Sequence, residues 1–407
     1  MTALVGIMNK RAAVMAADSA MTVTKDGKSK IYNTETKIFQ VSNHPVGVMI
    51  YGSLEFMDTP WELILKLFYK KWGDKEHKTI KEYAEDLISF LDDNDYFCDK
   101  DSQESYLVDE FMSYFYRTMN LARYYASQDG IDEEQAPAPE YIRKAMEHLL
   151  RDYEEFGINP AWKHYGFDKF QSDTKDALKG LSGFLEDRGV SADMEYEWVR
   201  GLYEYCRSNA LEETTGLVFV GYGSKDIFPS LVELQVAGAY EGKLRSWFGS
   251  VEQIDRNNSA TICLFAPKDV IHSLLKGLRP DLHEYIVDMM EDKVSSIKND
   301  ILNTLVEQGV SRDVIEKVAA LDVNDVRQKF VDQLAQKIQD SSISGVVDAV
   351  ESFNIADMVK MAESLISVTN LHRHFSSSEE SVGGPVDVAV ITKTEGFVWL
   401  SHKPSVI

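Results

Sequence analysis

Short apolar runs separated by tight polar turns stand at both ends of the chain, and this arrangement limits the fold more than any other feature. Near the start, TALVGIM and RAAVMAADS flank the polar pair Asn9 and Lys10, and KIFQVS and VGVMIYGS follow. Short apolar runs joined by turn residues predict β-hairpins. Because strands joined by hairpins pair antiparallel, we expect antiparallel sheet here rather than βαβ units.

Two long stretches with helical periodicity interrupt the strands. From Pro60 to Glu212 apolar residues recur at helical spacing, as in IKEYAEDLISFLDD, and a second helical stretch covers Asp269 to Phe375. Between them lie TTGLVFVGYGS, SLVELQVAGAYEGKLRSWF with a turn at Glu241 and Gly242, and ATICLFA. The closing VDVAVITKTEGFVWLS predicts two more strands.

This order of sheet, helices, sheet, helices and strands predicts an α+β fold. If the first and last strands share sheets that the helices cover, the result is a four-layer α-β-β-α sandwich of antiparallel sheets. No flexible linker separates helices from strands, so we interpret residues 60–212 and 269–340 as helical insertions in one domain over 1–407. Separate helical domains are the alternative.

Composition excludes several classes of partner. The chain has 407 residues, with 43 Lys and Arg against 66 Asp and Glu, a net charge of −23. Nucleic acids and anionic membranes would repel such a surface. The three cysteines are scattered without a CxxC pair, so neither a disulfide framework nor a zinc site is expected. No run reaches the roughly 18 apolar residues of a membrane span, and we expect a cytoplasmic protein.

Four sequence blocks carry a family resemblance. TALVGIMNKRAAVMAADSAMT, KIFQV, VGVMIYGS and GGPVDVAVITKTEGFVWL stand in this order along the chain. Together they resemble the N-terminal-nucleophile (Ntn) hydrolases, specifically the proteasome β-type subunits and their bacterial homologues. The resemblance covers the two ends of the chain. It implies the α-β-β-α Ntn-hydrolase sandwich and hydrolysis of amide bonds by an N-terminal threonine.

The resemblance also assigns catalytic roles. Thr2, exposed by removal of Met1, would be the nucleophile, and its own α-amine the general base. An α-amine with a pKa of about 7.7 to 8.0 can take the hydroxyl proton near neutral pH. Asp18 matches the acid behind the nucleophile and Lys37 the buried lysine that it holds charged. Gly52 matches the glycine whose N–H stabilises the oxyanion.

Other positions match the family less completely. Thr22 falls on the strand that would pair with bound substrate. Near the C-terminus the family carries an Asp and a Ser before paired glycines, where this chain reads SSEESVGGPVD. Glu379 or Glu380 would replace the Asp, while Ser381 lies one residue before the expected position, which Val382 occupies. A shift of one residue along a strand turns a side chain to the other face.

Each catalytic assignment has a simpler alternative. Thr2 can be an ordinary small second residue, and Asp18 can close an Asx-turn. Lys37 can be an exposed strand lysine, with Lys30 as a second candidate for the buried one. Gly52 can simply end a strand.

Three functions follow from these patterns. The first is a proteasome-like threonine peptidase acting on peptides or proteins, in a homo-oligomer such as a ring, with an ATPase as a candidate partner. The second is an Ntn amidase or acylase acting on a small non-protein amide. The third is a catalytically silent assembly protein with the same fold. We expect no cofactor and no metal, since the pair His372 and His374 would diverge on a helix.

Overall fold

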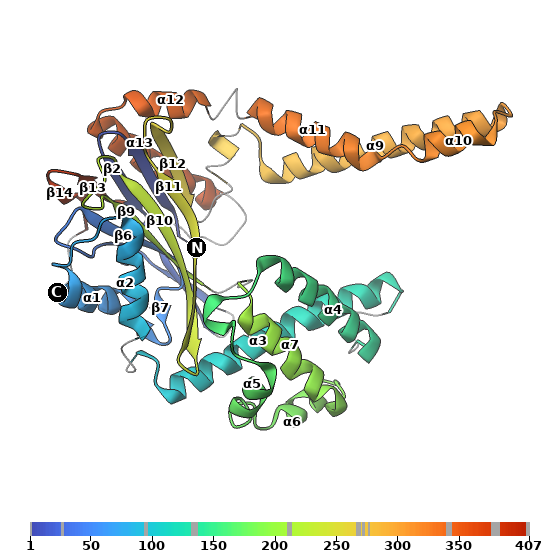
Figure 1. Ribbon diagram of the computed structural model, residues 1–407, viewed down its shortest axis with the longest axis horizontal. Coiled ribbons are helices and arrows are strands. Elements are labelled where there is room, and N and C mark those ends of the chain that lie inside the picture. Colours follow the sequence, from blue (N-terminus) through green and yellow to red (C-terminus); the bar gives the residue numbers. More distant parts are fainter. Residues whose placement is uncertain are drawn as a thin grey trace. The chain divides into compact units, whose positions relative to one another are not determined.

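The computed structural model describes residues 2–25, 28–92, 97–131, 137–209, 214–265, 270, 273–275, 277–338, 344–375 and 383–403 (Figure 1). The chain divides into two compact units. The first comprises Met1–Glu35, Ile254–Val390 and Trp399–Ile407, and the second comprises Thr36–Gln253 and Ile391–Val398. The fold is α+β, with antiparallel sheets and many helices.

A sheet that joins the two ends of the chain forms the base of the first unit, although residues Ile391–Val398 in its last two strands belong to the second unit. Its strands run in the order β12 (Ala260–Phe265), β1 (Leu4–Asn9), β2 (Ala13–Ala17), β13 (Asp387–Thr392) and β14 (Gly396–Ser401). β1 pairs antiparallel with both β12 and β2. The predicted hairpin at the start and the predicted strands at the end therefore share one sheet, as expected.

Two helices pack on one face of this sheet. α12 (Ser344–Ser352) lies against β12 and β1, and α13 (Ile355–Phe375) lies against β1 and β2. Alternate residues of β1 and β2 form an apolar core with Met358, Leu365 and Ile366 of α13. The β1–β2 turn is fastened to α12, because Asn9 Nδ2 donates to the carbonyl oxygens of Val350 (3.0 Å) and Phe353 (3.1 Å).

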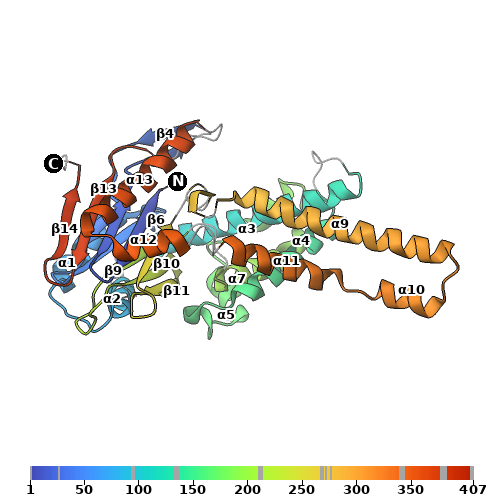
Figure 2. The ribbon, with the colours of Figure 1, turned by 90° about the horizontal axis from the view of Figure 1, so that it is seen from above.

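The rest of the second helical stretch forms a hairpin of helices. α9 (Pro280–Glu307) packs against α10 (Arg312–Ala319) and α11 (Val323–Ile338). Figures 1 and 2 both show α9 and α11 side by side. Most of their described side chains are exposed. Across the described part of the chain, no helix is both long and apolar enough to cross a lipid bilayer.

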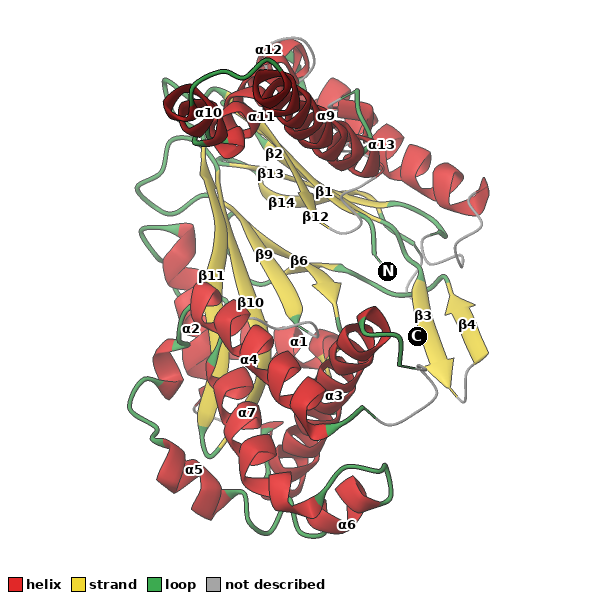
Figure 3. Ribbon diagram, turned by 90° about the vertical axis from the view of Figure 1, so that its right-hand side faces the viewer, coloured by secondary structure: helices red, strands yellow, loops and turns green. Residues whose placement is uncertain are grey.

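The second unit contains a fully antiparallel sheet. Its strands run in the order β11 (Lys243–Gln253), β10 (Ser230–Tyr240), β9 (Thr215–Gly221) and β6 (Val46–Gly52), which Figure 3 shows, followed by β5 (Ile38–Gln40). The predicted turn joins β10 to β11, with φ of 50° at Glu241 and 66° at Gly242. Two consecutive left-handed residues are typical of a type I′ hairpin turn.

One face of this second sheet is covered by α1 (Trp61–Trp72) and α2 (Ile80–Asp92). The apolar face predicted for 80–91 is confirmed, because Ile80, Tyr83 and Leu87 are buried against β-strand residues such as Val48 and Phe219.

The remaining helices of the second unit share an aromatic-rich core. They are α3 (Lys100–Gln128), α4 (Pro139–Phe156), α5 (Phe167–Asp173), α6 (Leu181–Glu186) and α7 (Glu195–Arg207), with 3₁₀ turns η2 (Pro160–Trp162) and η3 (Ala192–Met194). Short hairpins complete the chain: β3 (Met21–Lys25) with β4 (Lys28–Tyr32), and β7 (Glu55–Phe56) with β8 (Thr59–Pro60).

A buried arginine fastens these helices to the second sheet. Arg245 of β11 is fully buried. Its Nη1 lies 3.2 Å from Glu110 Oε2 and also donates to the Tyr106 hydroxyl (2.6 Å), and both of these residues are on α3. Its Nη2 donates to the carbonyl oxygen of Tyr205 on α7 (3.3 Å). Arg245 thus links one strand to two helices.

We expect Glu110→Ala to destabilise the protein by about 3 to 5 kcal/mol, because it leaves the Arg245 guanidinium buried without its carboxylate. Replacing both partners by apolar residues, as in Glu110→Leu with Arg245→Met, should recover much of this loss. Urea unfolding of the two variants and the wild type measures the difference. Equal midpoints for Glu110→Ala and the wild type would show that the ion pair is not a significant link.

Candidate active site

Thr2 directly precedes the buried strand β1, and only 5% of its surface is exposed. The next residue, Ala3, forms hydrogen bonds to Asp18 through both its N–H and its carbonyl group. The Ala3 N–H donates to Asp18 Oδ1 (2.8 Å), and the Ala3 carbonyl oxygen accepts from the Asp18 N–H (3.1 Å). Because Leu4 pairs with Ala17, these bonds extend the β1–β2 pairing by one step. The peptide bond between Thr2 and Ala3 is therefore held beside the Asp18 carboxylate.

Asp18 is fully buried and accepts hydrogen bonds from three backbone N–H groups. Besides the bond from Ala3, its Oδ2 accepts from Ala20 (3.2 Å) and Gly383 (3.1 Å). The bond from Ala20, two residues along the chain, is an Asx-turn. The other two donors are 15 and 365 residues away in sequence. Closing an Asx-turn therefore explains only one of the three bonds, and Asp18 joins three separate segments.

The paired glycines of the C-terminal block lie at this carboxylate. Glu379 and Ser381 lie outside the described residues, but Gly383, two residues after Ser381, donates to Asp18. Gly384 has φ of +77°, and a Cβ there would lie 2.9 Å from Asn33 Cβ. Both the conformation and the close approach favour glycine.

Lys37 lies in the second unit, directly before β5, and is fully buried. Its carbonyl oxygen accepts from the Ile50 N–H of β6 (2.8 Å). Lys30 is exposed, and its Nζ lies 4.7 Å from the centre of the Tyr32 ring. An exposed strand lysine is therefore the wrong interpretation of Lys37 and the right one for Lys30.

Gly52 ends β6 in a conformation that excludes a side chain. Its φ is +85°, and a Cβ would lie 2.1 Å from the carbonyl oxygen of Thr214. The carbonyl group of the next residue is also held in place, because Thr215 Oγ1 donates to the Ser53 carbonyl oxygen (2.9 Å) and accepts from Trp61 Nε1 (2.9 Å). The conformation and the close approach require glycine at this strand end, and the role of the Gly52 N–H at an oxyanion stays a prediction.

The predicted site residues fall into two groups. Thr2 and Asp18 are brought together in the first unit. In the second unit, Lys37 directly precedes β5 and Gly52 ends β6, and these two strands are paired. The pairing of Asp18 with Lys37 stays a prediction. Thr22 lies on β3 opposite Ile31, and its side chain is outside what the structure describes.

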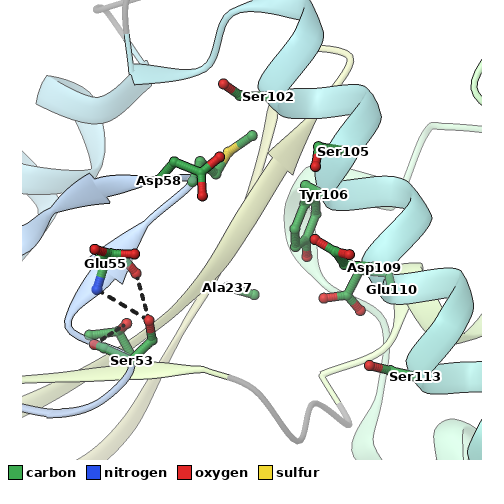
Figure 4. A pocket seen from close by; sticks show the side chains of 12 residues that line it. Ser53, Glu55, Asp58, Ser102, Ser105, Tyr106, Asp109, Glu110, Ser113 and Ala237 are labelled. Carbon is green, nitrogen blue, oxygen red and sulfur yellow. Dashed lines mark hydrogen bonds between the residues drawn. The ribbon is translucent and has the colours of Figure 1, made fainter. Parts of the chain in front are cut away.

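A cavity of about 280 Å³ adjoins the Gly52 end of β6 in the second unit (Figure 4). Its walls are mainly hydroxyl and carboxylate side chains. They are Ser53, Glu55, Asp58, Ser102, Ser105, Tyr106, Asp109, Glu110, Ser113 and Thr215, with Met57 and Ala237. Burial, and then the charges of Asp58 and Glu110, raise the pKa of Asp109.

Sequence reasoning missed this cavity because its walls come from segments far apart in the chain. The available signal was the spacing of Ser102, Ser105, Tyr106, Asp109 and Ser113, which places polar residues on one face of a helix.

Cysteine nucleophiles and metal ligands are two alternatives to a threonine nucleophile. Burial raises the pKa of the Cys206 thiol to about 12, so it stays protonated near neutral pH and is a poor nucleophile. Among the side chains that the structure describes, no three His, Cys, Asp or Glu residues are grouped so as to hold a metal ion.

Comparisons with known proteins show a distant likeness among solved structures. No protein-family model matches the sequence, and no curated protein matches it. Among solved structures, the chain is similar to the Anbu (Gly-1) mutant from Hyphomicrobium sp. strain MC1. The identity is 11% and the TM-score 0.29, over 100% of this chain and 89% of that chain. A likeness at this TM-score supports no assignment of activity or assembly.

Proposed function

We propose that this chain is a proteasome β-like Ntn hydrolase, a threonine peptidase that cleaves peptide bonds with Thr2 after removal of Met1. The observation that carries the proposal is the hydrogen bond from the Ala3 N–H to the buried carboxylate of Asp18. It holds the residue that would become N-terminal beside an acid, as the resemblance of the N-terminal block implies. The Gly383 N–H donates to the same carboxylate, so the paired-glycine block of the resemblance also contacts Asp18.

In the proposed reaction, the α-amine of Thr2 takes the proton of the Thr2 hydroxyl while Oγ attacks the substrate carbonyl carbon. The Gly52 N–H would stabilise the oxyanion, and the charge of Lys37 would favour the incipient alkoxide. The protonated amine then gives its proton to the leaving nitrogen as the C–N bond breaks. Water, deprotonated by the same amine, then attacks the carbonyl carbon of the remaining ester. The amine returns this proton to Thr2 Oγ as the C–O bond breaks, which frees Thr2.

The proposal includes the four-layer Ntn sandwich. The chain has two five-stranded sheets, each with helices on one face: α12 and α13 on the sheet that contains β1 and β2, and α1 and α2 on the sheet that contains β6 and β9. Stacking the two sheets through their other faces would give the order α-β-β-α. A fully buried Lys37 and a left-handed Gly52 on neighbouring strands support the placement of the catalytic residues.

Mass spectrometry tests the proposal directly. We expect the intact mass of the purified protein to lack Met1, and incubation with a peptidyl β-lactone to add one equivalent of probe. Tandem mass spectrometry of the labelled protein should map the adduct to Thr2.

The outcome separates the three candidate functions. Retention of Met1 with no adduct would contradict the proposal and favour a catalytically silent protein of this fold. An adduct on Thr2 without cleavage of peptides, but with hydrolysis of small acyl amides, would favour the amidase alternative.

A further inference from the structure

The side chain of Lys403, near the C-terminus, is bound among three segments of the first unit. Its Nζ donates to Ser19 Oγ (2.9 Å), to Asp387 Oδ2 (3.1 Å) and to the carbonyl oxygen of Glu35. An ammonium group has three N–H donors, and these three acceptors satisfy all of them. Only 11% of the Lys403 side chain is exposed.

Asp387, the first residue of β13, anchors the C-terminal segment. Its side chain is almost fully buried and contacts Lys403 through both oxygens, since Oδ1 accepts from the Lys403 backbone N–H (3.1 Å). His402 Nδ1 lies 3.3 Å from the same oxygen, and its ring stacks on Trp399 at 4.2 Å between centroids. His402 and Lys403 are thus held at the start of β13 by backbone, charge and ring contacts.

Ser19 connects Lys403 to the surroundings of Asp18. Its Oγ donates to the carbonyl oxygen of Pro385 (2.8 Å), and its N–H donates to the carbonyl oxygen of Gly383 (3.2 Å). Gly383 in turn donates to Asp18 Oδ2 (3.1 Å). Lys403 therefore binds Ser19, the residue next to Asp18. It also holds both ends of the segment 383–387, one directly through Asp387 and the other through the bond between Ser19 and Gly383.

We propose that Lys403 is a positioning residue that keeps the Asp18 carboxylate, and through it the Thr2–Ala3 peptide, in a fixed place. This inference rests on the proposed function, because Thr2 is the group whose position matters. Lys403 acts only through Ser19 and the segment 383–387. Small displacements of a reacting group lower reaction rates strongly, by as much as about 10²-fold for 1 Å.

The test compares Lys403→Met with Lys403→Arg in the full chain, using the labelling of Thr2 by a peptidyl β-lactone. For Lys403→Met we expect the maximal labelling rate to fall on the order of tenfold, while the probe concentration for half-maximal rate changes less than about twofold. Lys403→Arg keeps the charge and should label faster than Lys403→Met. Lys393→Met is the matched control, because Lys393 Nζ also donates to two carbonyl oxygens, those of Gly223 (2.8 Å) and Ser224 (3.2 Å).

A second measurement does not depend on activity. Hydrogen exchange should become faster at the amides of Ala3, Ala20 and Gly383 in Lys403→Met and stay unchanged in Lys393→Met. If Lys403→Met does not fold, Ser19→Ala takes its place, since it removes the link while leaving the Lys403–Asp387 ion pair. The same slower labelling and faster exchange are then expected.

The outcomes distinguish this inference from the proposed function. A wild-type protein that the β-lactone does not label contradicts the proposed function. Hydrogen exchange at Ala3, Ala20 and Gly383 still shows in that case whether Lys403 holds the Asp18 carboxylate in place. A labelled wild type with Lys403→Met labelling at the same rate overturns the positioning role, even if exchange rises. A slower Lys403→Met with unchanged exchange at these three amides also overturns it, because the route through Asp18 would be wrong.

Discussion

Replacing Thr2 by alanine is expected to lower peptide hydrolysis on the order of 10⁴-fold or more, the scale seen when a covalent nucleophile is removed. The α-amine would remain, since alanine also permits removal of Met1, but no hydroxyl would be left to attack the carbonyl carbon. The protein should still fold, with a small loss of stability, because the substitution removes one hydroxyl and one methyl group from the buried Thr2 side chain. Steady-state hydrolysis of a fluorogenic peptide and thermal unfolding measure the two effects.

Two variants serve as controls for Thr2→Ala. Thr2→Ser keeps both hydroxyl and amine and should retain activity. Thr304→Ala changes an exposed threonine of α9, whose hydroxyl donates to the Asp300 carbonyl oxygen on its own helix (2.8 Å), and should hydrolyse peptides at the wild-type rate. If Thr2→Ala hydrolyses peptides at the wild-type rate, the proposed mechanism is wrong.

The strands and their hairpins were predictable because the information that sets them is local. Asn9 and Lys10 mark one turn, and Glu241 with Gly242 supplies the two left-handed residues that another turn requires. The apolar face of α2 follows from spacing alone. The sequence does not show that the second helical stretch becomes the hairpin of α9, α10 and α11, since its apolar residues fit a buried layer equally well.

Residues of the candidate site were predictable where they belong to a sequence motif. Contacts between residues far apart in the chain were not predictable. Asp18 stands in a matching block, but its bond from Gly383 joins residues 365 positions apart. Lys37 and Lys30 look alike in sequence, and only burial separates them. Lys403 resembles any other lysine after a strand, because nothing local indicates that Asp387 and Ser19 will surround its ammonium.

Gly52→Ala is expected to reduce both stability and activity. The loss of stability follows from the backbone conformation and a steric clash, and the loss of activity from displacement of the Gly52 N–H. A left-handed conformation costs a non-glycine residue roughly 1 to 2 kcal/mol. At Gly52 the added Cβ would also lie 2.1 Å from the Thr214 carbonyl oxygen, so the backbone must move. If the Gly52 N–H stabilises the oxyanion, its displacement should lower kcat by about 10² to 10³-fold.

Gly130→Ala is the matched control for Gly52→Ala. Gly130 has a similar φ of +79°, but a Cβ there would meet no described atom within 4 Å beyond its chain neighbours. Both variants bear the conformational cost, and only Gly52→Ala bears the collision and the shift of the N–H. Urea unfolding should therefore show a larger loss for Gly52→Ala, and kcat should fall in that variant alone. A folded Gly52→Ala protein with wild-type kcat would remove Gly52 from the oxyanion site while leaving Thr2 as the nucleophile, since the two roles depend on different groups.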